Sequence, residues 1–181
     1  MSRKNLIVGQ SGGPTAVINS SLYGVVSEGR RHPDAIEHIY GMINGIEGFL
    51  KETILDFAEV LPGEKLDGLK STPGAYLGSC RYKLPESLED PVYPKLFKKF
   101  EEMNIGWFFY IGGNDSMDTV SKLSRYAEKI GSDIRVIGEP KTIDNDLVHT
   151  DHTFGFHTAV DIATESIERI QTTAFSHSRV M

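Results

Sequence analysis

The sequence of 181 residues contains a single cysteine, no long apolar run and no excess of basic residues. With Cys80 alone, neither an intrachain disulfide nor a cysteine-based zinc cluster can form. No stretch approaches the roughly 20 apolar residues that cross a membrane, and the apolar run after Lys4 is too short for a secretory signal peptide. The formal net charge of −6 argues against a general nucleic-acid binder. We therefore expect a cytoplasmic protein that engages neither membranes nor nucleic acids.

Two common nucleotide-binding motifs are also absent. The glycines within residues 9–13 are not spaced as in the dinucleotide fingerprint, which disfavours a dinucleotide oxidoreductase. Gly63 and Gly68 have the separation found in a Walker phosphate loop, but Leu69 intrudes before Lys70 and no strand precedes them.

The apolar pattern indicates a fold that alternates strands with helices. A hydrophobic content of 39% and a charged fraction of 24% are ordinary for a globular domain. Apolar runs predict strands at residues 5–8, 38–40, 107–111 and 135–138, and helical spacing predicts helices at 17–29, 91–104, 115–130 and 158–173. This alternation predicts an α/β fold: a doubly wound, mostly parallel, Rossmann-like sheet with helices on both faces. Residues 56–77 are rich in turn formers, and no element is assigned there.

Glycine-rich turns follow two of the predicted strands. They are Gly9-Gln10-Ser11-Gly12-Gly13-Pro14-Thr15 and Gly112-Gly113-Asn114-Asp115-Ser116. Glycines there let backbone N–H groups approach an anion, and the amino terminus of a following helix favours negative charge. Two alternatives stay open: a tight connection without a ligand at the first turn, and simple helix capping by Asn114 or Asp115 at the second.

An acidic loop, Pro140-Lys141-Thr142-Ile143-Asp144-Asn145-Asp146, follows the predicted strand at 135–138. Ligands of open α/β sheets bind at the carboxyl ends of strands, where an acidic pair would repel phosphate unless a metal or cations are present. Two acids beside a lysine and a hydroxyl therefore suggest phosphoryl transfer, with one carboxylate as base, another near Mg²⁺, and the lysine facing the migrating charge.

Together these motifs resemble the phosphofructokinase family, and within it the pyrophosphate-dependent branch. The resemblance covers residues 12–179, and its most specific motif is Thr142-Ile143-Asp144-Asn145-Asp146. It implies that Asp144 is the base that deprotonates the sugar 1-hydroxyl, that Thr142 contacts the sugar or its transferring phosphoryl group, and that Asp146 helps to organise a Mg²⁺–phosphate cluster. Asn114 stands where many members carry a metal-associated aspartate, so the metal would depend more on Asp146 and on pyrophosphate itself.

The resemblance also implies the binding residues. Gly12, Gly13, Gly113 and Arg81 correspond to contacts with the phosphoryl donor. Arg179 corresponds to an arginine that reaches the sugar phosphate, often across a subunit interface, so a homo-oligomer is expected for the full-length protein.

Two positions concern the choice of donor. Asp115 and Lys141 both stand where ATP-dependent members have glycine. A carboxylate would repel the α-phosphate of a nucleotide, and a lysine provides a point charge for pyrophosphate. We therefore expect reversible transfer of a phosphoryl group from pyrophosphate to fructose 6-phosphate, with Asp144, Lys141, Asp115 and Thr142 as the catalytic set and Mg²⁺ as cofactor.

The carboxyl end suggests that the chain is part of a longer protein, because residues 176–181 read as a loop that enters another strand. We expect residues 1–181 to be an incomplete donor-binding domain that lacks the sugar-phosphate-binding domain and is inactive alone. Two other functions stay open: an ATP-dependent 6-phosphofructokinase, and a non-catalytic phosphate-binding or regulatory module, which Asn114 and the missing half would favour.

Overall fold

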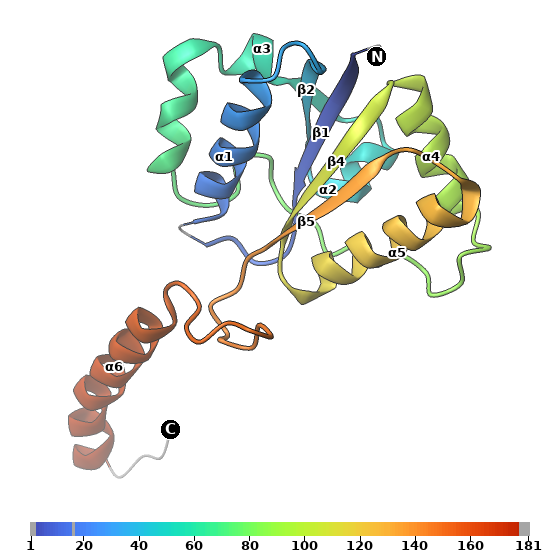
Figure 1. Ribbon diagram of the computed structural model, residues 1–181. Coiled ribbons are helices and arrows are strands. Elements are labelled where there is room, and N and C mark those ends of the chain that lie inside the picture. Colours follow the sequence, from blue (N-terminus) through green and yellow to red (C-terminus); the bar gives the residue numbers. More distant parts are fainter. Residues whose placement is uncertain (1–2, 16, 178–181) are drawn as a thin grey trace. The chain divides into compact units, whose positions relative to one another are not determined.

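The computed structural model describes residues 3–15 and 17–177, which divide into two compact units (Figure 1). The first unit, Met1–Lys141, contains a five-stranded sheet with helices on both of its faces. The second, Thr142–Met181, consists of a loop and the helix α6 (Phe156–Ser176). The sheet and its helices confirm the predicted α/β fold.

The sheet has the strand order β3-β2-β1-β4-β5. Its strands are β1 (Lys4–Gln10), β2 (Ile36–Met42), β3 (Ile54–Asp56), β4 (Ile105–Gly112) and β5 (Arg135–Pro140). β1 pairs in parallel with β2 and β4, and β4 pairs in parallel with β5. The four predicted strands are therefore confirmed. The antiparallel edge strand β3 was not predicted, because three residues are too few to show an alternating pattern.

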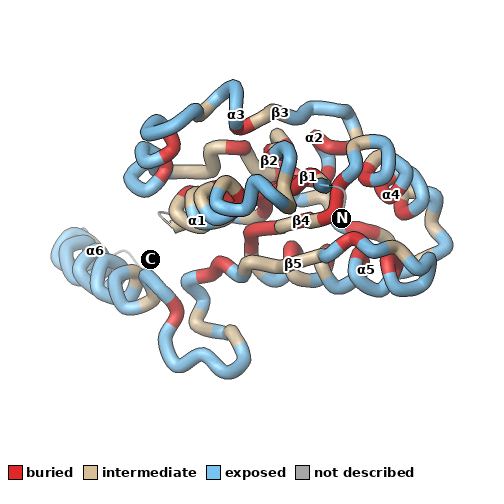
Figure 2. The backbone as a smooth tube through the Cα atoms, turned by 45° about the horizontal axis from the view of Figure 1, so that its top comes forward, coloured by how far each residue is buried: buried red, intermediate tan, exposed pale blue. Residues whose placement is uncertain are grey.

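Alternation along β1 creates a core on each face of the sheet. Leu6 and Val8 pack in one apolar cluster, and Ile7 between them packs in the other. Helix α1 (Ile18–Arg30) covers the first face through Leu22 and Val26, which are both fully buried. Helices α4 (Val92–Glu102) and α5 (Asn114–Ile130) cover the opposite face, so buried residues concentrate in the central strands (Figure 2).

Three short helices were not predicted from the sequence. They are α2 (Gly45–Leu50), α3 (Phe57–Val60) and the 3₁₀ helix η1 (Gly63–Lys70). Each is too short to show a helical repeat of apolar residues. Asp56 caps α3 by accepting a hydrogen bond from the Ala58 N–H at 2.8 Å. Aspartate is a common N-cap residue, but an aspartate alone does not predict the start of a helix.

Helix α6 buries none of its residues within the described structure (Figure 2). Its exposed apolar side chains are Val160, Ile162, Ile167, Ile170 and Phe175. Across residues 3–15 and 17–177, no helix combines the length and the apolar character that a membrane crossing requires.

The close approach of α2 to the preceding turn leads to a stability prediction. A Cβ on Gly48 would overlap the carbonyl group of Ile43, so we expect Gly48→Ala to lower the free energy of unfolding by about 1–3 kcal/mol. Gly24 lies in α1 with open space around it, so Gly24→Ala should instead gain about 0.5–1 kcal/mol from helix propensity. Chemical denaturation of both variants measures the two effects, and effects of the same sign would contradict the prediction.

Candidate functional site

The turns after β1 and β4 meet Lys141, the residue that follows β5, at the carboxyl edge of the sheet. The Lys141 N–H, just past β5, donates a hydrogen bond to the Gly112 carbonyl at the end of β4 over 2.8 Å. A Cβ on Gly12 would stand 3.7 Å from the Gly113 backbone nitrogen. The structure therefore brings the two predicted glycine turns and Lys141 together.

Both turns require glycine at the point where they meet. Gly12 has a φ of +78°, a left-handed conformation that favours glycine. A Cβ on Gly112 would overlap the hydroxyl of Ser116. Glycine at position 112 therefore allows the Ser116 side chain and the Ser11 carbonyl to pack closely against the second turn.

Lys141 provides a buried cation at the first turn. Its residue is only 4% exposed, and its ammonium group donates a hydrogen bond to the Gly13 carbonyl. Burying an ammonium group is costly unless hydrogen bonds compensate it. A positive charge held next to the glycine turn can attract phosphate as a point charge.

The loop that carries Arg81 is attached to the same turn. The Gly12 N–H and the Ser11 hydroxyl both donate to the Cys80 carbonyl, at 3.3 Å and 3.1 Å. Cys80 is buried, as expected of a small apolar residue, and its sulfur lies 3.6 Å from the Tyr110 hydroxyl, whose pKa burial raises. The next residue, Arg81, is exposed. Its backbone follows directly on a residue that is hydrogen-bonded to the glycine turn.

The second turn leads directly into α5. Gly113 occupies the N-cap position and no side chain caps the helix, so the interpretation of Asn114 or Asp115 as the capping residue is wrong. The helix of 17 residues directs its first N–H groups and the positive end of its dipole toward this edge. Asp115 pairs with Lys83 at 3.0 Å, but both side chains are about 70% exposed, and such pairs add little stability.

Two hydroxyl groups in these turns were not singled out from the sequence. Thr15 and Ser116 each carry a buried side-chain oxygen that has no hydrogen-bond partner within the described part of the chain. Buried polar groups are normally paired, so these two oxygens are exceptions within the described residues. Their place in the two glycine turns was visible in the sequence, but a hydroxyl in a turn is too common to single out alone.

From Thr142 on, the acidic loop belongs to the second unit, and side chains of that unit hold its backbone. The Thr142 hydroxyl accepts a hydrogen bond from the Asp144 N–H at 3.0 Å. Asn145 has a φ of +57°, and its side-chain oxygen accepts from the Thr153 N–H at 2.7 Å. These bonds fix the backbone while the residues Asp144 and Asp146 remain exposed.

The remaining predicted residues concern the sugar and the metal. Arg179 lies outside the described residues. Within those residues, no three His, Cys, Asp or Glu side chains are grouped as in a metal cage built by protein alone. Mg²⁺ is commonly held by one or two carboxylates together with substrate phosphates, and the oxygens of Asp146 and Asn114 are ligands of the kind it accepts.

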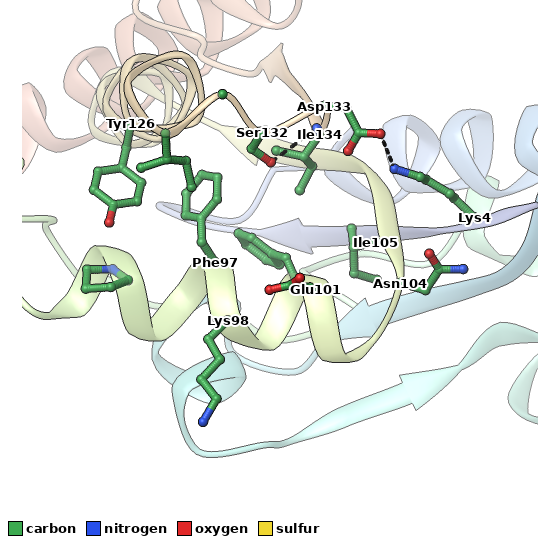
Figure 3. A pocket seen from close by; sticks show the side chains of 14 residues that line it. Lys4, Phe97, Lys98, Glu101, Asn104, Ile105, Tyr126, Ser132, Asp133 and Ile134 are labelled. Carbon is green, nitrogen blue, oxygen red and sulfur yellow. Dashed lines mark hydrogen bonds and ion pairs between the residues drawn. The ribbon is translucent and has the colours of Figure 1, made fainter. Parts of the chain in front are cut away.

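A cavity of about 590 Å³ lies at the other end of the sheet (Figure 3). Lys4 at the start of β1, Ile105 at the start of β4, and Phe97 and Tyr126 from α4 and α5 are among its lining residues. Asp133 pairs with Lys4 at its rim. Because ligands of open α/β sheets bind at the carboxyl ends of strands, this cavity is not the candidate site.

An open sheet whose glycine turns, buried lysine and helix amino terminus converge at the carboxyl edge has the features of a phosphate-binding α/β protein. Comparison of the sequence with known protein families identifies the family within this class. The sequence profile of the family described as phosphofructokinase matches residues 5–181, and the chain belongs to the phosphofructokinase family.

Individual relatives agree with this assignment. The chain is 42% identical over 170 residues to the pyrophosphate–fructose 6-phosphate 1-phosphotransferase of Halomonas elongata, covering 93% of this chain and 40% of that relative. The crystal structure of a pyrophosphate-dependent phosphofructokinase from Nitrosospira multiformis superposes with a TM-score of 0.82 at 39% identity, over 97% of this chain and 43% of that one. The corresponding enzyme structure from Marinobacter aquaeolei gives 0.79 at 44% identity, over 93% and 41%. The chain thus spans about 40% of the length of the relatives it matches.

Proposed function

We propose that this chain is the donor-binding part of an enzyme that transfers a phosphoryl group from pyrophosphate to fructose 6-phosphate, reversibly, giving fructose 1,6-bisphosphate and phosphate. The observation that carries the proposal is the buried Lys141, whose ammonium group is held on the Gly13 carbonyl at the first glycine turn. The names of the similar proteins support pyrophosphate as the donor.

The donor would bind at the carboxyl edge of the sheet. Gly12, Gly13 and Gly113 would present backbone N–H groups, while Lys141 and Arg81 would supply positive charge for the transferring group. Pyrophosphate has no nucleoside for the protein to grip, so closely held cations would provide most of the attraction. Asp115 at the second turn would repel the additional phosphate of a nucleotide.

The acidic loop would carry the acceptor chemistry. Asp144 would take the proton from the sugar 1-hydroxyl as that oxygen attacks the phosphoryl group, and Thr142 would contact the sugar or the phosphoryl group. Asp146, with Asn114 and the pyrophosphate oxygens, would hold Mg²⁺, which would neutralise charge on the phosphates.

Other parts of the proposal rest on the family alone. Arg179 would contact the sugar phosphate, the complete enzyme would form a homo-oligomer in the cytoplasm, and residues 1–181 by themselves would not turn over substrate. In this arrangement, a further domain would supply most of the contacts with the sugar phosphate.

A coupled assay of the full-length gene product with fructose 6-phosphate and Mg²⁺ tests the function. We expect turnover when pyrophosphate is the donor and none when ATP replaces it. Turnover with ATP alone would contradict the roles of Lys141 and Asp115. Binding of pyrophosphate without turnover would indicate a non-catalytic module instead.

A further inference from the structure

Two buried amide side chains face each other beside the candidate site. Gln10 ends β1 and Asn19 lies in the first turn of α1, and neither is exposed to solvent. The Gln10 side-chain N–H groups donate to the Asn19 side-chain oxygen at 3.0 Å and to the Ile18 carbonyl at 3.1 Å. The pair therefore joins the end of the central strand to the start of the helix that follows the glycine turn.

The same two amides hold a long irregular loop. The Gln10 side-chain oxygen accepts from the Leu77 N–H at 2.8 Å, and the Asn19 oxygen accepts from the Tyr76 N–H at 2.8 Å. The Asn19 amide nitrogen donates to the Thr72 carbonyl at 2.8 Å. This loop runs from η1 to α4 without helix or strand, so its backbone must find partners outside regular secondary structure.

Further along the same loop, residues 79 and 80 contact the first glycine turn. The Gly12 N–H donates to the Cys80 carbonyl at 3.3 Å, and the Ser79 hydroxyl donates to the Gly12 carbonyl at 2.5 Å. Residues 72–80 are thus tied first to the amide pair and then to the turn, and Arg81 follows immediately.

We infer that Gln10 and Asn19 are positioning residues that set the place of Arg81 relative to the glycine turn, and so control the affinity for the phosphoryl donor. The inference rests on the proposed function, because it assigns the effect to pyrophosphate. Gln10 supplies an acceptor to the loop backbone, and Asn19 supplies both an acceptor and a donor. An apolar side chain of similar size would leave those backbone groups buried and unpaired, which would favour a shift of the loop.

A third buried amide, which lies on β1 like Gln10, provides a matched control. Asn5, near the start of β1, donates to the Met103 carbonyl at 2.7 Å and accepts from the His38 N–H at 3.0 Å. It bridges two connecting segments as Gln10 and Asn19 do, but at the opposite edge of the sheet. Loss of Asn5 should therefore lower stability without moving Arg81.

The experiment compares Gln10→Met, Asn19→Leu and Asn5→Leu in the full-length gene product. Thermal unfolding is measured beside the KM for pyrophosphate and for fructose 6-phosphate. We expect Gln10→Met and Asn19→Leu to raise the KM for pyrophosphate by about tenfold to a hundredfold, because small displacements of a positioned group have effects of this size. The KM for fructose 6-phosphate should stay unchanged, and Asn5→Leu should change neither KM.

A milder variant covers the case in which the apolar variants do not fold. Asn19→Ser removes the bond to the Thr72 carbonyl and introduces neither a charge nor apolar bulk at this buried position. Its KM for pyrophosphate should lie between those of the wild type and Asn19→Leu, or simply above that of the wild type when Asn19→Leu is insoluble.

The outcomes separate this inference from the proposed function. A wild-type protein that does not use pyrophosphate overturns the function, and the inference with it. A wild-type protein that uses pyrophosphate, with an unchanged KM in the Gln10 and Asn19 variants, overturns the inference alone. Equal increases in KM for both substrates would also overturn it, because they would indicate a general loss of the site.

Discussion

Asp144→Asn, made in the full-length gene product, is expected to lower kcat with pyrophosphate and fructose 6-phosphate by about a hundredfold to ten-thousandfold, the usual contribution of a positioned general base. The KM for pyrophosphate should change little, because the variant keeps the size of the side chain. The Asp144 N–H bond to the Thr142 hydroxyl is made by the backbone and survives the substitution, so the loop keeps its conformation. Steady-state rates at saturating substrate give the comparison.

Asp151→Asn is the matched control for this prediction. Asp151 is an exposed aspartate in the same connection before α6 and has no role in the proposed chemistry. Its variant should keep wild-type kcat. A loss of less than about tenfold in Asp144→Asn would be too small for a general base and would reassign proton removal to another group.

The sequence predicted the architecture wherever an element was long enough to show its period. The apolar runs that became β1, β4 and β5, and the helical spacing that became α4 and α5, were placed within a few residues of their observed ends. Strand β3 and helix α2 were missed because three and six residues carry too little pattern. The sheet order could not be read directly either, since it depends on which strands pair across long connections.

The candidate site was less predictable because its contacts join distant parts of the chain. The sequence identifies Lys141 as a cation, but it does not show that the ammonium group contacts the Gly13 carbonyl, 128 residues away. Asn114 and Asp115 were considered as capping residues, but the helix begins one residue earlier and leaves its N-cap to Gly113. The role of Gln10 and Asn19 also depends on a loop some 57 to 67 residues further along the chain. A local motif indicates which residue types are available, whereas the fold decides which of them meet.

Lys141→Met is expected to lower kcat/KM for pyrophosphate by about a hundredfold to a thousandfold, as loss of one preorganised donor to a transferring group commonly does. The matched control is Lys122→Met in α5. Lys122 is as deeply buried, at 3% against 4% exposure, but its ammonium group pairs with Glu86 and Asp118 at 2.6 Å and 2.7 Å. Hydrogen bonds to Asp118 and Glu86 raise the pKa of Lys122, so Lys122 remains charged near neutral pH.

The comparison of the two lysines distinguishes a functional cation from a structural one. Lys122→Met removes a buried charge that already has two carboxylate partners and should therefore lower stability while leaving kcat/KM unchanged. The ammonium group of Lys141 donates to the Gly13 carbonyl and so stands at the glycine turn, where the proposed function places the donor phosphate. If both variants lose the same activity for the same loss of stability, the proposed role of Lys141 is wrong.

A double variant at Lys141 and Asp115 tests which groups select pyrophosphate over ATP. Lys141→Gly combined with Asp115→Gly should weaken the use of pyrophosphate and permit turnover with ATP, because the variant lacks both the point charge for pyrophosphate and the carboxylate that repels a nucleotide phosphate. Asp115 is exposed and its pair with Lys83 is weak, so removing it should leave the fold intact. Assays with each donor separately decide the matter. A double variant that keeps its preference for pyrophosphate would show that selectivity arises from groups other than these two side chains.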